Sequence, residues 1–300
     1  MILIISNNGD STTTKVIKYL SAMGKTFIRV HEDEFFEIKT DKKRIYLISD
    51  RNSFFLDEIV STWYRRGGLK FKRISYENNA ANHHMDEHQH WLEDYVIKTL
   101  ESKKSINKQS NNHVNKLLVL EQAKKIGLNV PEYFLAENTD EVIIHETITK
   151  PITENVILDS VDKNFNGIIY TSIVQEKEKE NFFITFFQEK IEKDFEIRSF
   201  YLDGKIWSTA IISQNDEQTK TDFRKYNYKN PNRKVSYQLP ENIEEKTYQL
   251  MQSLDLSCGS IDFIKSGDIF YFLEVNPTGQ FIGLSDTCNY SLEKEIAQYL

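Results

Sequence analysis

The stretch GSIDFIKSGDIFYFLEVNP, residues 259–277, decides the fold, because it is typical of two strands joined by a tight turn. The turn is Ser266-Gly267, and an apolar run flanks it on each side. In such a hairpin Asp262 and Glu274 can be cross-strand neighbours that point to one face. Asn276 lies two residues beyond Glu274, so the period of a strand places it on that face as well.

Two carboxylates and an amide oxygen on one face make an all-oxygen site that suits Mg²⁺. Magnesium keeps several waters and is shared with substrate phosphates, so a nucleotide site needs few protein ligands. Asp262 and Glu274 could instead simply face solvent. The residues around them favour a hairpin inside a core, because they are apolar: Ile261, Phe263, Phe272, Leu273 and Val275. The sequence therefore predicts a magnesium site at Asp262, Glu274 and Asn276.

Two lysines upstream are candidates for binding phosphate. Lys116 opens a predicted helix, and Lys150 ends an apolar run just before Pro151. A lysine at the end of a buried strand is costly without an anionic partner, and nucleotide phosphates are such partners. A solvated surface lysine is an equally good interpretation of Lys116 and a weaker one of Lys150.

Three further segments carry groups that suit a nucleotide. Residues 188–191, QEKI, follow a strand and could present backbone groups to an adenine edge. Glu196 and Arg198 share one face of the next strand, where a carboxylate could hold ribose hydroxyls and a guanidinium could lie beside a negative intermediate. A structural ion pair is the alternative for them. Arg224 could reach a transferred phosphoryl group, or lie at a solvated hairpin tip.

Length and composition limit the possible classes of protein. The 300 residues suit two or three packed sub-domains. With 38 Lys and Arg against 45 Asp and Glu, the net charge is −7, which makes a nucleic-acid partner a poor candidate. The N-terminus is interpreted as a first strand and not a signal peptide, and no membrane partner is expected, so we expect a cytoplasmic location. Cys258 and Cys288 lack CxxC spacing and are interpreted as packing thiols.

The first hundred residues alternate between strand and helix patterns, which implies a small parallel α/β domain. Strands are expected at 2–6, 26–30, 44–49 and 60–66, and helices at 11–23 and 77–101. Residues 102–113 have no apolar periodicity and are interpreted as a linker or exposed loop. After a helix at 116–126, strands are expected at 142–148, 168–175, 182–188, 195–202, 205–212, 260–265 and 269–275, with helices at 242–254 and 292–300.

Together these segments resemble the ATP-grasp superfamily, in its ribosomal-protein-S6-glutamate-ligase-like branch. Within that branch the likeness is greatest to the peptide maturases that make graspetides (microviridin-type, "grasp-with-spasm"). It covers essentially the whole chain and is most specific in FLEVNPTGQF, residues 272–281, with SIDF at 260–263 upstream. Support of the same kind comes from EIRSFYLDGK at 196–205 and TDFRKYN at 221–227, and moderate support from TWYRR at 62–66.

The resemblance implies an α/β (α+β) chain with the ATP-grasp fold in three parts. These are a parallel α/β pre-ATP-grasp domain with a linker at 1–112, a central lid subdomain at 113–187, and an antiparallel-sheet subdomain with the metal site at 188–300. ATP and Mg²⁺ are the implied cofactors. Many relatives carry a glycine-rich flap over the phosphates, whereas residues 155–173 hold only Gly167 here. Glu196 also stands where related enzymes often have Asp.

The resemblance also assigns roles residue by residue. Lys116 and Lys150 become phosphate-binding lysines, and Glu189 and Lys190 become the adenine hinge. The neighbouring Gln188 and Ile191 become further nucleotide contacts. Glu196 becomes the ribose or nucleotide contact, and Arg198 and Arg224 become the cations around the transferred phosphate and the acyl phosphate. The magnesium ligands are Asp262, Glu274 and Asn276. An acidic substrate needs basic receptors, for which Arg65, Arg66, Arg73 and Arg233 are candidates.

The implied activity is that of an ATP-dependent carboxylate ligase acting on a precursor peptide with a leader and a core rich in acids and hydroxyls. Asp or Glu side chains would become acyl phosphates, and Thr or Ser hydroxyls would close ω-ester macrocycles. Two alternatives remain open: an amide-forming amino-acid ligase, and a nucleotide-binding protein without turnover. A homodimer is also left open. His84 and His88 share a helical face that could bind zinc, but a solvated helix face is the favoured interpretation.

Overall fold

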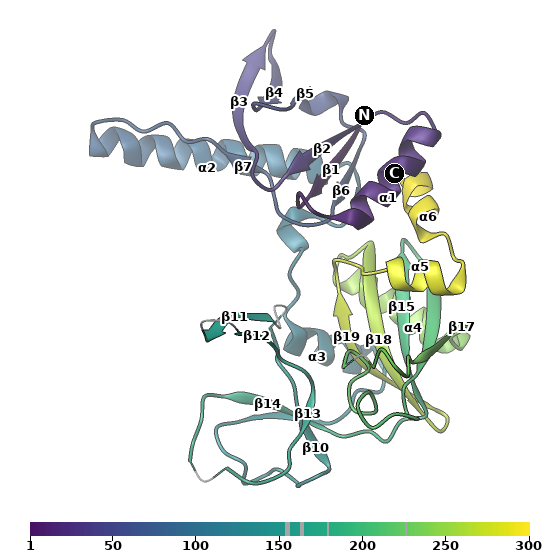
Figure 1. Cartoon of the computed structure of the whole chain (residues 1–300). Helices are drawn as coiled ribbons and strands as arrows, with labels where there is room; N and C mark the ends of the chain where they lie inside the picture. The colour runs from purple at the N-terminus through teal and green to yellow at the C-terminus, as the bar shows by residue number, and fades with distance from the viewer. Residues whose placement is uncertain (154–156, 163–164, 179, 226) are drawn as a thin grey trace.

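The computed structural model describes residues 1–153, 157–162, 165–178, 180–225 and 227–300. A parallel sheet with the order β2-β1-β6-β8 forms its N-terminal part (Figure 1). The strands are β1 (Ile2–Ser6), β2 (Phe27–His31), β6 (Ser61–Tyr64) and β8 (Lys104–Ile106). Helix α1 (Ser11–Ala22) begins at Asp10, whose carboxylate accepts a hydrogen bond from the Thr13 N–H. With the long helix α2 (Asn79–Glu101), these elements confirm the predicted parallel α/β domain.

Two expectations for this part are wrong. The stretch 102–113 is not a plain linker, because it contains β8 and the 3₁₀ helix η2 (Gln109–Asn111). Strand β8 has three residues, too few to show a period of two. The predicted strand at 44–49 is β4 (Arg44–Ile48), which pairs antiparallel with β3 and lies outside the parallel sheet.

Strand β4 belongs to a second N-terminal sheet with the order β5-β4-β3-β7. Its other strands are β3 (Phe35–Asp41), β5 (Ser53–Phe55) and β7 (Lys70–Phe71), and η1 (Leu56–Glu58) follows β5. Phe36, Leu47 and Phe54 are buried against the parallel sheet. The sequence did not predict β3, since its last five residues, Glu-Ile-Lys-Thr-Asp, are mostly polar.

The lid sheet, as we call β13-β10-β14-β9, lies in the middle of the chain. Its strands are β9 (Tyr133–Ala136), β10 (Thr147–Thr149), β13 (Ser172–Ile173) and β14 (Thr185–Glu189). A separate antiparallel pair is formed by β11 (Ile157–Asp162) and β12 (Phe165–Ile168), drawn above the lid sheet in Figure 1. The predicted strand at 142–148 is wrong over most of its length, because Thr147 N–H bonds to the Ile143 carbonyl in a turn. Of the predicted strand at 168–175, only Ile168, which ends β12, and the two residues of β13 are in strands. The flap region 155–173 lies partly outside the described residues.

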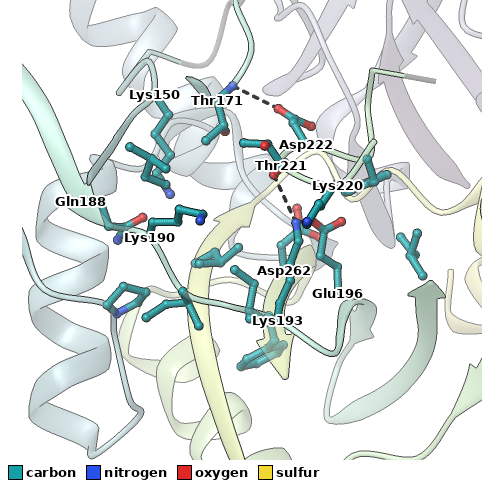
Figure 2. Close-up of a pocket in the computed structure, with 18 of the residues that line it drawn as sticks. Lys150, Thr171, Gln188, Lys190, Lys193, Glu196, Lys220, Thr221, Asp222 and Asp262 are labelled. Atoms are coloured by element: carbon teal, nitrogen blue, oxygen red, sulfur yellow. Dashed lines mark hydrogen bonds and ion pairs between the residues drawn. The ribbon is translucent and has the colours of Figure 1, made fainter. Parts of the chain in front are cut away.

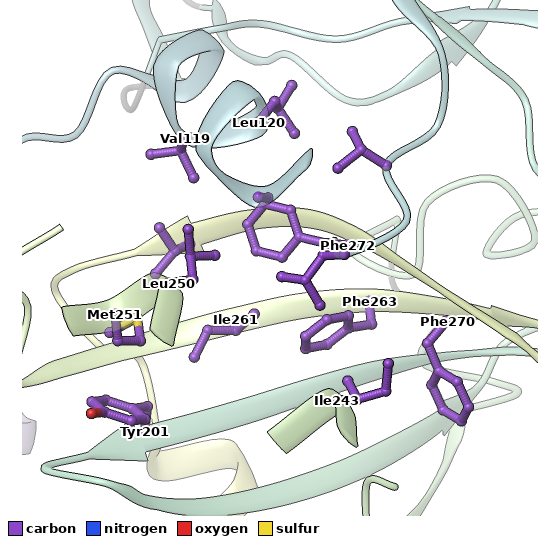
Figure 3. Packing of buried hydrophobic residues seen from close by; sticks show 14 of the residues in the cluster. Val119, Leu120, Tyr201, Ile243, Leu250, Met251, Ile261, Phe263, Phe270 and Phe272 are labelled. Atoms are coloured by element: carbon purple, nitrogen blue, oxygen red, sulfur yellow. The ribbon is translucent and has the colours of Figure 1, made fainter. Parts of the chain in front are cut away.

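A five-stranded antiparallel sheet, β17-β16-β15-β18-β19, forms the C-terminal part. Its strands are β15 (Phe195–Leu202), β16 (Lys205–Ile212), β17 (Arg233–Tyr237), β18 (Cys258–Ser266) and β19 (Ile269–Asn276). Strands β15 and β16 match their predicted ranges, whereas β17 was not predicted. Figure 3 shows the core on one face, where Val119 and Leu120 of α3 (Lys116–Ile126) lie over Phe272 of β19. Helix α4 (Glu241–Ser253) adds Leu250 and Met251 to it.

The two ends of the chain share a second core, so the parallel and antiparallel sheets are joined by packing. Helices α5 (Ile282–Cys288) and α6 (Leu292–Tyr299) follow β19, and α6 lies beside α1 (Figure 1). Leu284 and Ile296 pack in one cluster with Ile4 of β1 and Phe200 of β15. None of the helices in the described part of the chain is both long enough and apolar enough to cross a membrane.

Candidate active site

A cleft of about 230 Å³ lies between the lid sheet and the antiparallel sheet. Figure 2 shows Lys150, Gln188 and Lys190 on the lid side, and Glu196 and Asp262 on the side of the antiparallel sheet. Most of the predicted site residues line it: Lys150, Gln188, Glu189, Lys190, Ile191, Glu196, Arg198, Arg224, Asp262 and Glu274. Segments that are far apart in sequence therefore meet in one cleft.

The two carboxylates predicted on the hairpin are direct cross-strand partners. Asp262 of β18 pairs with Glu274 of β19, and a β-bulge follows immediately after Asp262. Arg198 Nε and Nη2 donate to Asp262 Oδ1 and Oδ2, both at 2.8 Å. Lys116 Nζ lies 3.0 Å from Glu274 Oε2. Among the described residues Asp262 thus forms an ion pair with Arg198 and Glu274 forms one with Lys116, and both carboxylates line the cleft.

Asn276 lies two cross-strand pairs further along the same hairpin, opposite Ser260. The strand period places it on the face of Glu274, and its Oδ1 accepts a hydrogen bond of 3.0 Å from the Thr278 N–H. Among the described residues that line the cleft, Asn276 does not appear. No cluster of three or more His, Cys, Asp or Glu that could hold a metal occurs among the described residues. A site with two carboxylates and one amide oxygen fits Mg²⁺ only where phosphates complete its shell.

The two lysines both interact with Glu274, Lys116 through an ion pair and Lys150 through the charge of the carboxylate. Lys116 is the first residue of α3, and Asn115 caps this helix by accepting the Leu117 N–H at 3.0 Å. Lys150 directly follows β10, and burial lowers its pKa, opposed by the charge of Glu274 and assisted by that of Lys116. Two lysines close to one carboxylate leave an excess of positive charge, which suits a polyanion such as a nucleotide phosphate.

Two buried polar groups in the cleft lack protein partners for part of their hydrogen-bonding capacity. Gln188 is 0% exposed, and neither its Nε2 nor its Oε1 has a partner among the described residues. Glu196 Oε2 is likewise unpaired in this part of the chain, while Oε1 accepts from Lys193. Burial raises the pKa of Glu196 to about 7. Since such atoms are costly to bury unpaired, this side of the cleft fits a ligand with its own donors and acceptors, such as adenosine.

Arg224 is held by a residue that the sequence reasoning missed. Asp222, 4% exposed, accepts from Arg224 Nε at 2.9 Å and from Nη2 at 2.6 Å. It also accepts the Thr171 N–H at 3.1 Å, which joins the loop after β16 to the lid side of the cleft (Figure 2). The only sequence signal for this ion pair is the tripeptide DFR, in which one residue separates the Asp222 and Arg224 charges. Arg224 is thus oriented by a carboxylate that also fixes the lid.

A second cleft, of about 570 Å³, lies against the C-terminal edge of the parallel sheet. Arg65 and Arg66 line it together with the start of α1 and α5, and Arg198 and Phe223 line both clefts. The other two predicted substrate arginines lie elsewhere. Arg73 pairs with Asp86 and Glu93 on the surface of α2, and Arg233 starts the edge strand β17. Exposed His84 and His88 on α2 agree with a solvated helix face.

No family model matches the chain, and no match is found among the curated proteins. Solved structures do match. The macrocyclase MdnC from Microcystis aeruginosa MRC, bound with precursor peptide MdnA, is 25% identical with a TM-score of 0.75, and the match covers 100% of this chain and 98% of that chain. A RiPP-associated ATP-grasp ligase from Chryseobacterium gregarium, in complex with ADP and a leader and core peptide, is 25% identical with a TM-score of 0.79, covering 99% and 94%.

A third match is more distant in sequence and shows the fold alone. The ATP-grasp ligase PsnB, complexed with a phosphomimetic variant of a minimal precursor, Mg and ADP, is 13% identical with a TM-score of 0.67, covering 99% of this chain and 96% of that chain. The chain therefore has the ATP-grasp fold, as its sequence predicts, and the two matches at 25% identity are a macrocyclase and a RiPP-associated ATP-grasp ligase, each solved with a peptide.

Proposed function

We propose that this chain is an ATP-dependent ligase that acts on a ribosomally made precursor peptide. It activates Asp or Glu side chains as acyl phosphates and closes ω-ester macrocycles with Thr or Ser hydroxyls of the same peptide. The observation that carries this proposal is Arg198, which lines both the cleft with the lysines and carboxylates and the second cleft beside Arg66. A nucleotide in the first cleft and the reacting carboxylate of a peptide in the second cleft would both lie next to the Arg198 guanidinium.

The proposed chemistry has two steps, phosphoryl transfer to the peptide carboxylate and then acyl transfer to a hydroxyl. A peptide carboxylate oxygen bonds to the γ-phosphorus of ATP while the bond to the bridging oxygen breaks, which releases ADP. A hydroxyl oxygen then bonds to the acyl carbon, loses its proton and displaces phosphate. Lys116 and Lys150 would hold the phosphates, and Arg198 and Arg224 would stabilise charge on the transferred group. Asp262, Glu274 and Asn276 would hold Mg²⁺, which when bound neutralises phosphate charge.

Substrate contacts follow from the second cleft. Arg66 lines it, and we propose Arg66 as a receptor for acidic side chains of the peptide. Arg65 lines the same cleft, but its guanidinium is bonded to Asp10 and to the carbonyls of Thr278 and Gly279.

We further propose that the chain is divided into three units at 1–112, 113–187 and 188–300, with the nucleotide cleft between the second and the third.

Gln188 would read the base of the nucleotide. A glutamine amide can accept from adenine N6–H and donate to N7, whereas guanine presents two acceptors there. We expect Gln188→Met to raise the KM for ATP about tenfold and to reduce the ATP-over-GTP preference by about the same factor, given ~1–3 kcal/mol for a bidentate pair. Steady-state ADP and GDP release measures both. Gln214→Met is the control, because Gln214 lines the same cleft but its amide donates to Ser213 and Lys220. An unchanged nucleotide preference in Gln188→Met would exclude this role.

The peptide itself tests the proposed function. We expect a peptide with Thr/Ser-rich and Asp/Glu-rich motifs, encoded beside this chain, to lose water when incubated with ATP, and to do so only with ADP release. Mass spectrometry before and after mild alkali checks the bond, since esters reopen and amides do not. A gain in mass with an added amino acid would favour the amide-forming ligase instead. Binding of the nucleotide without ADP release would favour a protein without turnover.

A further inference from the structure

The turn that follows the β18–β19 hairpin is fixed by hydrogen bonds within itself and to other parts of the chain. We call residues 276–279, Asn276-Pro277-Thr278-Gly279, the metal turn. Within it, the Gly279 N–H donates to the Asn276 carbonyl at 3.0 Å, and the Thr278 N–H donates to Asn276 Oδ1 at 3.0 Å. Gly279 has φ +62, and a Cβ there would lie 2.9 Å from Cys258 Sγ, so the turn has little room to shift.

The remaining carbonyls of the metal turn are bonded to the N-terminal part of the chain. Arg65 Nη1 donates to the Thr278 carbonyl and, at 3.0 Å, to the Gly279 carbonyl. Arg65 is 5% exposed, and its Nε donates to Asp10 Oδ2 at 3.2 Å. The guanidinium fork therefore spans a buried carboxylate on one side and two carbonyls on the other, a geometry that no lysine reproduces.

Asn107 makes the matching contact from the neighbouring strand. Its Nδ2 donates to the Pro277 carbonyl at 2.6 Å and to the Cys258 carbonyl at 3.0 Å, and its Oδ1 accepts the Cys258 N–H at 3.0 Å. Asn107 is 4% exposed and has φ 53, in the left-handed region. Arg65 and Asn107 directly follow β6 and β8, which are adjacent parallel strands, so both project from one edge of the parallel sheet.

We propose that Arg65 and Asn107 are positioning residues for the metal site, through which the N-terminal sheet sets the orientation of Asn276. Thr278 is the connecting residue, because its carbonyl is held by Arg65 while its N–H orients Asn276 Oδ1. An amide oxygen has two lone pairs, so Oδ1 can accept this N–H and still bind a cation. Arg65 is thereby a support for a metal ligand and not a receptor for the substrate. The inference rests on the proposed function, because it requires the magnesium assignment.

Manganese binding tests this inference without depending on turnover. Mn²⁺ stands in for Mg²⁺, and electron paramagnetic resonance of free Mn²⁺ gives its affinity for the protein in the presence of ADP. We expect Arg65→Lys and Asn107→Gly each to weaken Mn²⁺ binding about 10- to 100-fold, as loss of groups that orient metal ligands does elsewhere. Glycine tolerates the left-handed backbone of residue 107, so Asn107→Gly removes the amide without adding strain. In turnover, raised Mg²⁺ restores the kcat of both variants, and the KM for the peptide stays as in the wild type.

The control is an arginine that supports the same sheet edge without touching the metal turn. Arg29 Nη2 donates to the Asn7 carbonyl and Nε to Ser6 Oγ, both at 2.8 Å, so Arg29→Lys loosens this edge in a comparable way. Its Mn²⁺ affinity should equal that of the wild type, with thermal unfolding by circular dichroism recorded for every variant. Wild-type Mn²⁺ affinity in folded Arg65→Lys and Asn107→Gly overturns the inference. Wild-type protein that binds no Mn²⁺ with ADP overturns the metal assignment itself.

Discussion

Glu274→Gln is expected to lower substrate-dependent ADP release by about 10²–10³-fold or more, while the protein stays folded. Burial alone would raise the pKa of Glu274, but Lys116 and Lys150 hold it below its usual value, so the group is a carboxylate at neutral pH. Glutamine keeps the shape of the side chain and removes the charge. The substitution therefore weakens a hard-cation ligand and leaves two lysines facing a neutral amide.

The measurement is a coupled assay of ADP release with the precursor peptide, together with a thermal melt followed by circular dichroism. Glu295→Gln is a matched control, because Glu295 has a side chain 28% exposed and pairs with Lys205 at 3.1 Å, against 25% and 3.0 Å for Glu274 with Lys116. We expect the control to turn over at the wild-type rate. Unchanged turnover in Glu274→Gln would remove Glu274 from the metal site.

The hairpin could be predicted from the sequence because its signals are local. The tight turn between the apolar runs was predicted at Ser266-Gly267 and lies one residue later, at 267–268, because Ser266 still belongs to β18. The register that this turn sets would pair Asp262 with Leu273. The β-bulge after Asp262, which the sequence did not predict, shifts the pairing by one residue and makes Asp262 and Glu274 partners. The bounds of β15 and β16 followed from the same kind of pattern around Asp203-Gly204. Helix α3 also has local signals at both ends, with Asn115 as its cap and Gly127 at φ 89 after its last residue.

The rest of the site could not be predicted, because it depends on contacts between distant segments. Neither Asp222 nor Asn107 carries a pattern that marks its partner, since Thr171 and Pro277 lie far away in sequence. The Gln188 amide has no partner in the described part of the chain, and this property of the folded cleft cannot be predicted from the segment QEKI. Arg65 and Arg66 are adjacent and chemically alike, yet Arg65 is buried and bonded to the turn after β19, whereas Arg66 is exposed and lines the second cleft. This difference depends on the fold and has no signal in the sequence.

Arg198→Lys is expected to reduce kcat by about 10²–10³-fold while the dissociation constant for ATP changes less than tenfold. Burial alone would lower the pKa of Arg198, but Asp262 raises it above its usual value, so the residue is charged throughout the working pH range. Lysine keeps this charge but loses the fork that bonds both Asp262 oxygens at 2.8 Å. The substitution should therefore lower the rate of the step in which charge develops between the two clefts more than it weakens nucleotide binding.

Single-turnover ADP formation and isothermal titration with ATP separate these two quantities. Arg44→Lys is the control for the geometry, because Arg44 makes the same two-pronged contact with Asp57, at 2.8 and 2.7 Å, on the exposed surface of β4. Exposed pairs of this kind contribute about 0–1 kcal/mol, so this variant should keep its activity. If Arg198→Lys lost ATP affinity in proportion to its rate, the guanidinium would serve nucleotide binding alone. The meeting point of the two clefts would then have to be sought at Phe223, which lines both, and not at Arg198.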